Sequence, residues 1–135
     1  MALFTWSDKY SVNINEIDNQ HKKLIGIINE LHDAMSKGKS NDILSNVLQD
    51  LIDYTRVHFA NEERIMNMHG YHDYTAHKAA HEDLLRQVTK FDKEFREGKF
   101  GLSIQMMNFL KDWLSKHILE TDKKYSPFLN SKGVI

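Results

Sequence analysis

The spacing of apolar residues constrains the fold most, because such residues recur every three or four positions along four long segments. The segments cover about 18–36, 40–68, 73–97 and 102 to just before Pro127. This spacing lines one face of an α-helix with apolar side chains and does not fit the alternation of a β-strand. The residues expected to face inward are Leu24, Ile28, Leu31, Met35, Leu44, Val47, Leu51, Tyr54, Ile65, Leu84, Val88, Phe91, Phe95, Met106, Leu110 and Trp113.

Short connections link these segments. They cover about 37–39, 69–72 and 98–101, and each contains a glycine of the kind that ends helices. Short links make successive long helices antiparallel neighbours. The expected fold is therefore all-α, an up-down-up-down antiparallel four-helix bundle, with Asp18 as the N-cap of its first helix.

The chain of 135 residues is long enough for one domain with a substantial core. We expect an N-terminal arm over 1–17 and the bundle over 18–128. Tyr10, Val12 and Ile14 alternate along the arm, which predicts an extended stretch that lies on the bundle.

Composition excludes several function classes. Eighteen Lys and Arg against nineteen Asp and Glu leave a net charge of −1, so we expect no binding to nucleic acid or anionic lipid through bulk charge. The chain has no Cys, which excludes disulfides, thiolate metal sites and a cysteine nucleophile. No apolar run is long enough to cross a membrane, and the N-terminus lacks the features of a secretory signal. The expected location is the cytoplasm.

Eight histidines are an unusual number for a chain of this length. Polar residues that continue the apolar stripes are His21, His58, Glu62, His77, His81, His117 and Asp122. In an up-down bundle they all lie at one end, because they fall at the start of the first and third helices and at the end of the second and fourth. The other histidines do not join them: His32 lies about three turns deeper, and His69 and His72 fall in a predicted turn.

Burial energetics favour a metal site at this end of the bundle. An unpaired buried carboxylate costs several kcal/mol, and no Lys or Arg occurs in these stripes. Taken singly, His21 is compatible with a hydrogen-bonded core residue, and the His58/Glu62 pair with a helix-surface pair. Their shared depth, together with the His77/His81 pair, favours bound metal cations as the compensating charge.

The number and type of donors indicate two metal ions, and among Zn, Cu, Fe and Ni, which all suit imidazole, they favour iron. Seven side chains are too many for one six-coordinate ion, whereas two such ions offer about twelve positions. Five histidines, two bridging carboxylates and one bridging oxygen would leave one position open. Zinc usually takes four ligands, whereas iron accepts six and passes electrons to O2. Because the set has more neutral imidazoles than carboxylates, we expect O2 binding rather than O2 activation, and therefore not an enzyme.

These residues resemble the hemerythrin family, in particular the single-domain bacteriohemerythrins. The resemblance covers essentially the whole chain. The matching pieces are Trp6, Asp18-x-x-His21, His58-Phe59-x-x-Glu62-Glu63, His77-x-x-x-His81 and Trp113-Leu114-x-x-His117-Ile118-x-x-x-Asp122-x-x-Tyr125.

The resemblance implies a non-haem di-iron centre that binds O2 reversibly, for storage, delivery or scavenging. By the family's arrangement, His77, His81 and His117 hold the six-coordinate iron. His21 and His58 hold the iron that keeps an open position.

The same resemblance makes Glu62 and Asp122 bridges between the irons, alongside an oxo or hydroxo group. It implies that O2 is held on one iron as a hydroperoxide, and that azide or NO are further candidate ligands. The residues that match the apolar O2 pocket are Phe59, Trp113, Leu114 and Ile118. Plain bundle core is an equally compatible interpretation of these four.

The separation of His117 and Asp122 predicts a distorted helix. Five residues at about 100° each place the two side chains about 140° apart on a regular α-helix. Both reach one site only if a π-type or broken turn lies between them. Each ligating histidine is also expected to have a partner for its other ring nitrogen, which the sequence does not identify.

Three other functions remain open from the sequence. The first is a sensor module for O2, redox state or iron. The second is a di-iron enzyme such as a peroxidase or an NO scavenger, and the third is an iron store. The sequence does not indicate a protein partner.

Overall fold

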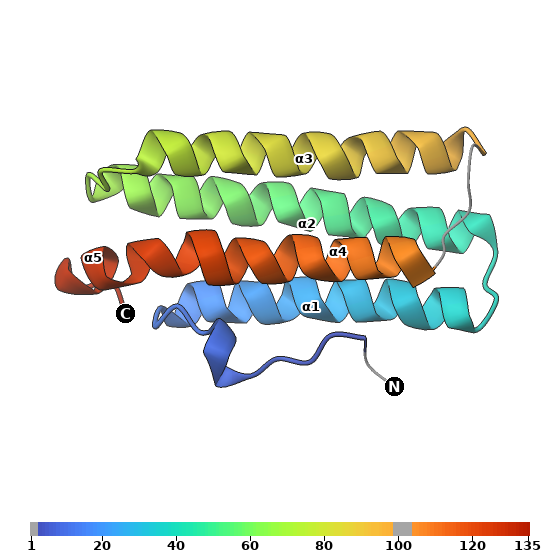
Figure 1. Ribbon diagram of the computed structural model, residues 1–135, viewed down its shortest axis with the longest axis horizontal. Helices are drawn as coiled ribbons and strands as arrows, with labels where there is room; N and C mark the ends of the chain where they lie inside the picture. Colours follow the sequence, from blue (N-terminus) through green and yellow to red (C-terminus); the bar gives the residue numbers. More distant parts are fainter. Residues whose placement is uncertain (1–2, 99–103) are drawn as a thin grey trace.

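The computed structural model describes residues 3–98 and 104–135, apart from the side chains of 104–106, and consists of antiparallel helices (Figure 1). The long helices are α1 (Asn15–Ser36), α2 (Asn41–Met68), α3 (Tyr74–Arg96) and α4 (Ile104–Lys116). The all-α four-helix bundle expected from the sequence is confirmed. The expected start of the fourth helix near Leu102 or Ser103 lies outside the described residues, as does the side chain of Met106.

Helix α1 begins three residues earlier than expected, so the prediction that Asp18 caps it is wrong. Ile14 occupies the N-cap position and offers no side-chain hydrogen bond. The Asp18 carboxylate instead accepts hydrogen bonds from Ser11 Oγ at 2.6 Å and from the Val12 backbone N–H at 2.8 Å. Asp18 therefore fastens the N-terminal arm to α1.

The helical path does not stop before Pro127, which corrects a second expectation. Helix α4 passes into a π-helical turn over His117–Thr121, a 3-10 turn over Asp122–Tyr125, and a short helix α5 over Ser126–Ser131. Pro127 lies in the first turn of α5. Its missing N–H costs nothing there, because the first N–H groups of a helix have no intrahelical partner.

Two apolar clusters lie on either side of the polar residues singled out in the sequence. The larger cluster fills the bundle and includes Leu24 and Phe59. The smaller cluster lies at the α5 end and includes Ile17, Met66 and Tyr125. The expected inward residues whose side chains are described are buried, apart from three that are half-buried and pack against the larger cluster: Met35, Tyr54 and Leu84.

The N-terminal arm lies along the bundle, as Tyr10, Val12 and Ile14 predict, and all three are buried. It is not extended throughout, since Asp8–Tyr10 forms a 3-10 turn. The Asn29 side chain accepts a hydrogen bond from the Phe4 N–H at 2.9 Å and donates one to the Phe4 carbonyl at 2.7 Å. This pair of bonds secures the arm near its beginning.

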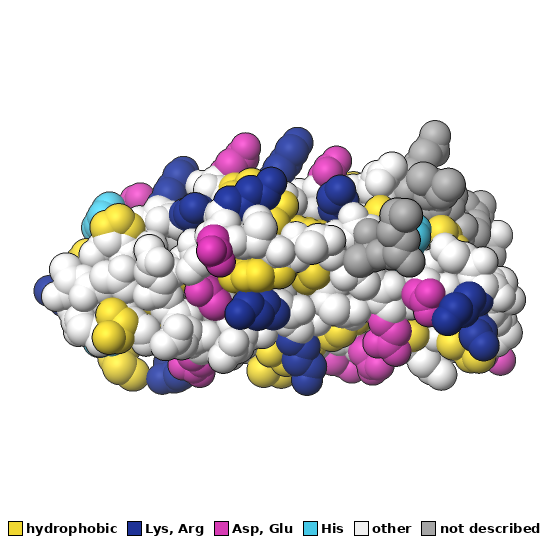
Figure 2. All heavy atoms as spheres, turned by 90° about the horizontal axis from the view of Figure 1, so that it is seen from below, with side chains coloured by type: hydrophobic (Ala, Val, Ile, Leu, Met, Phe, Trp, Pro, Cys, Tyr) yellow, Lys and Arg dark blue, Asp and Glu magenta, His cyan; other side chains and the backbone are white. Residues whose placement is uncertain are grey.

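The surface carries both signs of charge. On the face in Figure 2, basic, acidic and apolar side chains are interspersed. None of the helices in the described part of the chain is long and apolar enough to cross a membrane.

Replacing Asn29 tests how firmly the arm is held. Because Asn29→Ala removes two hydrogen bonds to Phe4, we expect a loss of about 1–3 kcal/mol in the free energy of unfolding. Urea denaturation measures this, with Asn19→Ala on the exposed side of α1 as the matched control. Equal stability of the two variants would show that the two hydrogen bonds between Asn29 and Phe4 contribute nothing to the free energy of unfolding.

Candidate metal centre

The seven polar residues predicted as ligands meet at the α5 end of the bundle. They come from the start of α1, the end of α2, the start of α3 and the irregular turns after α4. All seven are at most 5% exposed: His21, His58, Glu62, His77, His81, His117 and Asp122. They form two groups of potential metal ligands, each with donor atoms within 4.8 Å of one another.

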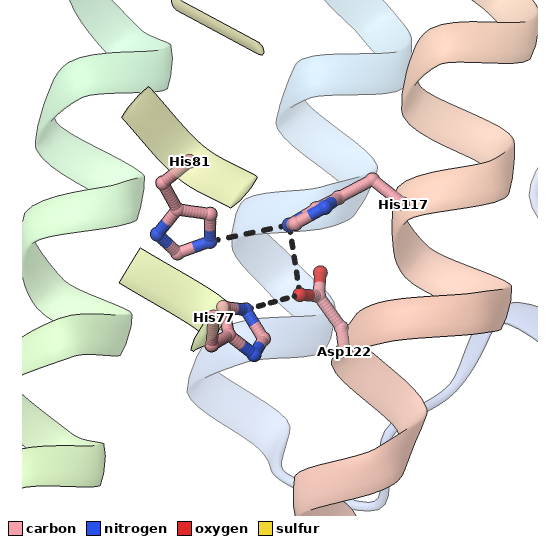
Figure 3. A group of neighbouring side chains, drawn as sticks. All are labelled: His77, His81, His117 and Asp122. Carbon is pink, nitrogen blue, oxygen red and sulfur yellow. Dashed lines mark hydrogen bonds and ion pairs between the residues drawn. The ribbon is translucent and has the colours of Figure 1, made fainter. Parts of the chain in front are cut away.

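The first group consists of His77, His81, His117 and Asp122, whose side chains point toward one another in Figure 3. Asp122 Oδ1 lies 3.0 Å from His77 Nε2 and 2.9 Å from His117 Nε2. His81 Nε2 lies 3.2 Å from His117 Nε2. Three imidazoles and one carboxylate oxygen thus surround one point.

The second group consists of His21, His58, Glu62 and again Asp122. Here the other oxygen of the aspartate is used, since Asp122 Oδ2 lies 3.0 Å from His21 Nε2. Glu62 Oε1 lies 2.5 Å from His58 Nε2. Asp122 therefore turns one oxygen to each group.

The π-helical turn over His117–Thr121 brings His117 and Asp122 to the same place. This is the distortion that their spacing predicted. A regular α-helix would point the two side chains about 140° apart. The wider π turn reduces that difference, and π turns are frequent at functional sites.

Two ring nitrogens turned away from the centre have partners that the sequence did not identify. His58 Nδ1 pairs with Gln20 Oε1 at 2.5 Å, and His81 Nδ1 pairs with Glu63 Oε2 at 2.9 Å. Such contacts fix the orientation of a ligating imidazole. Glu63 belongs to the His58-Phe59-x-x-Glu62-Glu63 motif, but the sequence did not indicate that it would bind His81. Nothing in the sequence indicated Gln20, which comes from another helix. The expectation fails for His21, whose Nδ1 is buried without a partner among the described residues.

Aromatic contacts restrain the ligands further. The Phe59 ring stacks on the His81 ring, with centroids 3.7 Å apart. The phenol of Tyr125, which is 1% exposed, donates a hydrogen bond of 2.6 Å to Glu62 Oε2. Burial, reinforced by Glu62 and Asp122, raises the pKa of Tyr125 well above its ordinary value, so the phenol remains a donor.

The electrostatics of the two carboxylates depend on the histidines. Burial raises the pKa of Asp122, but His117, His21 and His77 outweigh this and hold the pKa well below its usual value. Burial and Asp122 likewise raise the pKa of Glu62, and the histidines again lower it overall. Among the described residues, no Lys or Arg forms an ion pair with either carboxylate.

The pKa values of two histidines shift in opposite directions. Burial lowers the pKa of His81 to about 3, although Glu62 pulls it upward. Burial also lowers the pKa of His117, but Asp122 and Glu62 overcome this and raise it above its ordinary value. Five imidazoles therefore cannot all neutralise the carboxylates by accepting protons.

The donor set fits bound transition metals. Buried atoms of the centre without a hydrogen bond in the described structure are His21 Nε2, His58 Nε2, His77 Nε2, Glu62 Oε1 and both Asp122 oxygens. Buried polar atoms seldom remain unsatisfied. Imidazole nitrogen and carboxylate oxygen are ligands that first-row transition metals accept, so cations placed here would satisfy these atoms.

The four residues expected to line an O2 pocket are buried in the larger apolar cluster: Phe59, Trp113, Leu114 and Ile118. Three of them, with Leu84 and His117, surround a gap too small for a water molecule. Trp113 and His117 also line an open groove of about 480 Å³ between α3 and α4. The groove brings the surface close to the centre.

The metal-free protein is expected to be most stable near pH 6.5, the ordinary histidine value. Below it, His81 takes up a proton in the unfolded chain but not in the folded one, so stability falls toward pH 3. Above it, His117 keeps its proton longer when folded, so stability is lost as pH rises through its raised pKa. Each slope is at most about 1.4 kcal/mol per pH unit.

Urea unfolding of chelator-treated protein at pH 5, 6.5 and 8.5 measures this profile. Because Asp122 raises the pKa of His117 more than Glu62 does, the variant Asp122→Asn should show a smaller decline above pH 6.5. A stability that increases steadily to pH 8.5 in the unmutated protein would contradict the pairing of His117 with Asp122.

Comparison with known proteins agrees with this geometry. A family model described as the hemerythrin HHE cation binding domain matches residues 12–129. The bacteriohemerythrin of Methylococcus capsulatus is 37% identical over 132 residues, which cover 97% of this chain and 100% of that protein. Myohemerythrin-1 of Phascolopsis gouldii is 32% identical, over 90% of this chain and 91% of that protein.

A solved structure is also similar to this chain in both fold and sequence. The crystal structure of a wild-type hemerythrin superposes with a TM-score of 0.89 at 36% identity, and the match covers 95% of this chain and 98% of that chain. The family model, the relatives and the shared fold agree over nearly the full length. This four-helix chain, with its buried histidines and carboxylates, therefore belongs to the hemerythrin family.

Proposed function

We propose that this protein binds O2 reversibly at a pair of non-haem iron ions. The observation that carries the proposal is the placement of Asp122. Its Oδ1 lies 3.0 Å from His77 in one donor group, and its Oδ2 lies 3.0 Å from His21 in the other. One carboxylate with an oxygen turned to each of two groups is suited to bridge two cations.

Each group would hold one iron. His77, His81 and His117 would bind the iron with a complete set of ligands, and His21 and His58 would bind the iron with the open position. Two carboxylates would join the ions, together with an oxo or hydroxo bridge: Glu62 and Asp122. Imidazole and carboxylate donors in this ratio suit iron better than zinc, which usually takes four ligands.

The composition of the site favours binding over catalysis. When bound, the iron pair supplies the electrons that O2 takes up. The chain contributes five neutral imidazoles against two carboxylates, which gives less anionic charge to stabilise strongly oxidised iron. The residues proposed to line the O2 pocket are apolar and buried, so water and its protons are kept from the bound ligand: Phe59, Trp113, Leu114 and Ile118.

The relatives support O2 binding more than the alternatives. The similar proteins carry the names bacteriohemerythrin and myohemerythrin. The sensor, peroxidase and NO-scavenger interpretations have no comparable support. We further propose that O2 is the principal partner, with azide and NO as competing ligands, and that the protein acts in the cytoplasm.

Anaerobic loading with ferrous iron tests the proposal. We expect two irons per chain and a visible charge-transfer band that forms when O2 is admitted and disappears on purging with argon. Added azide should compete for the same open position. A band that never reverses would instead indicate an enzyme or a redox sensor.

The variant Asp122→Asn tests the shared carboxylate. Because it removes a ligand from both groups, we expect retained iron to fall below one per chain and the reversible band to vanish. Asp50→Asn, at an exposed position of α2, is the matched control and should keep both. Two irons per chain in Asp122→Asn would exclude Asp122 as the bridge.

A further inference from the structure

The two carboxylates of the centre differ in how they are held. Asp122 has one oxygen close to each donor group. Glu62 lies at unequal distances from the two groups. Its Oε1 lies 2.5 Å from His58 Nε2, whereas its Oε2 lies 3.9 Å from His77 Nε2. On the His77 side, the short contact of Oε2 is the 2.6 Å hydrogen bond from the Tyr125 hydroxyl. The Tyr125 hydroxyl is therefore the short contact of the Glu62 oxygen that faces the His77 side.

Tyr125 is itself held firmly. Its ring is stacked on the His77 ring, with centroids 5.4 Å apart and planes at 22°, and meets Tyr71 edge-on at 6.4 Å. It ends the 3-10 turn that begins with Asp122. The next residue, Ser126, donates a hydrogen bond of 2.6 Å to the Val12 carbonyl of the arm. The hydroxyl is thus a fixed donor and not a side chain that adapts to Glu62.

The chemistry of the carboxylate allows both contacts. An ionised carboxylate oxygen has two lone pairs, so Oε2 can accept the hydrogen bond from the tyrosine hydroxyl and still offer a lone pair to a cation on the His77 side. Without that hydrogen bond, the carboxylate can rotate so that both oxygens face the ion near His58. Glu62 would then serve one ion instead of two.

We propose that Tyr125 is a positioning residue that holds Glu62 across both donor groups, so that the carboxylate bridges two ions. This role rests on the proposed function, because it requires a pair of ions. It goes beyond that function by assigning the capture of the second ion to a residue that ligates neither.

The test is a titration of the metal-free protein with Co²⁺, which has visible bands in sites of this kind and suits the same donors. The variant Tyr125→Phe keeps the ring and its stacking but removes the hydroxyl. We expect both proteins to take up a first ion with similar affinity. The second ion should bind about 10–100-fold more weakly to the variant. Magnetic coupling between the two ions should also weaken, because Glu62 would no longer join them.

Two further variants separate positioning from general damage. Tyr71→Phe removes a hydroxyl from the neighbouring ring and should bind both ions as the unmutated protein does. Glu62→Gln removes the bridging charge. If Tyr125 acts through Glu62, the double variant Glu62→Gln/Tyr125→Phe should bind the second ion no more weakly than Glu62→Gln alone. In the double variant position 62 carries no charge that has lost its tyrosine hydrogen bond, so it can be measured even if Tyr125→Phe folds poorly.

The outcomes decide the proposal. Unchanged affinity for both ions in Tyr125→Phe overturns it, as does an additive loss in the double variant or an equal loss in Tyr71→Phe. If the unmutated protein takes up fewer than two ions, the proposed function fails and the bridge fails with it. If it takes up two but Tyr125→Phe is unaffected, only the role of Tyr125 is lost.

Discussion

The burial of two carboxylates inside an apolar bundle is the constraint on which the rest of the structure depends. Glu62 and Asp122 are each at most 1% exposed. A charge in such a place is costly unless other charges or strong donors surround it. The chain surrounds them with imidazoles from α1, α2, α3 and the π turn after α4. Burial nevertheless lowers the pKa of His81 to about 3, while the carboxylates raise that of His117. Protonation of the histidines alone therefore cannot neutralise both carboxylates, whereas bound cations would.

Both the regular helices and the irregular turns position the polar centre. The regular spacing of apolar residues places one cluster on each side of the polar centre and thereby excludes water from it. The π turn after α4 then brings His117 and Asp122 to one point. The arm secures the turns that follow, since Lys123 Nζ donates to the Lys9 carbonyl at 2.7 Å and Ser126 Oγ to the Val12 carbonyl. Irregular backbone thus occurs where the site requires it.

Much of this could be predicted from the sequence, because it follows from helical periodicity. Residue spacing was enough to predict the bundle, the placement of the ligands at one end of it and the distortion between His117 and Asp122. Contacts that depend on how neighbouring helices rotate against each other could not be predicted. Gln20 reaches His58 from another helix, 38 positions away. The cap assigned to Asp18 was wrong because α1 begins earlier, at Asn15, and the Asp18 carboxylate instead accepts hydrogen bonds from Ser11 and Val12 of the arm.

The two carboxylates meet the same requirement by different means. Asp122 lies where a π turn passes into a 3-10 turn, so the local backbone can aim its short side chain at both donor groups. Glu62 lies within the regular helix α2, where the backbone determines only which face the side chain occupies. Its longer side chain keeps rotational freedom that burial alone does not remove. A carboxylate on a regular helix therefore needs a fixed donor at its outer oxygen, and Tyr125 supplies it.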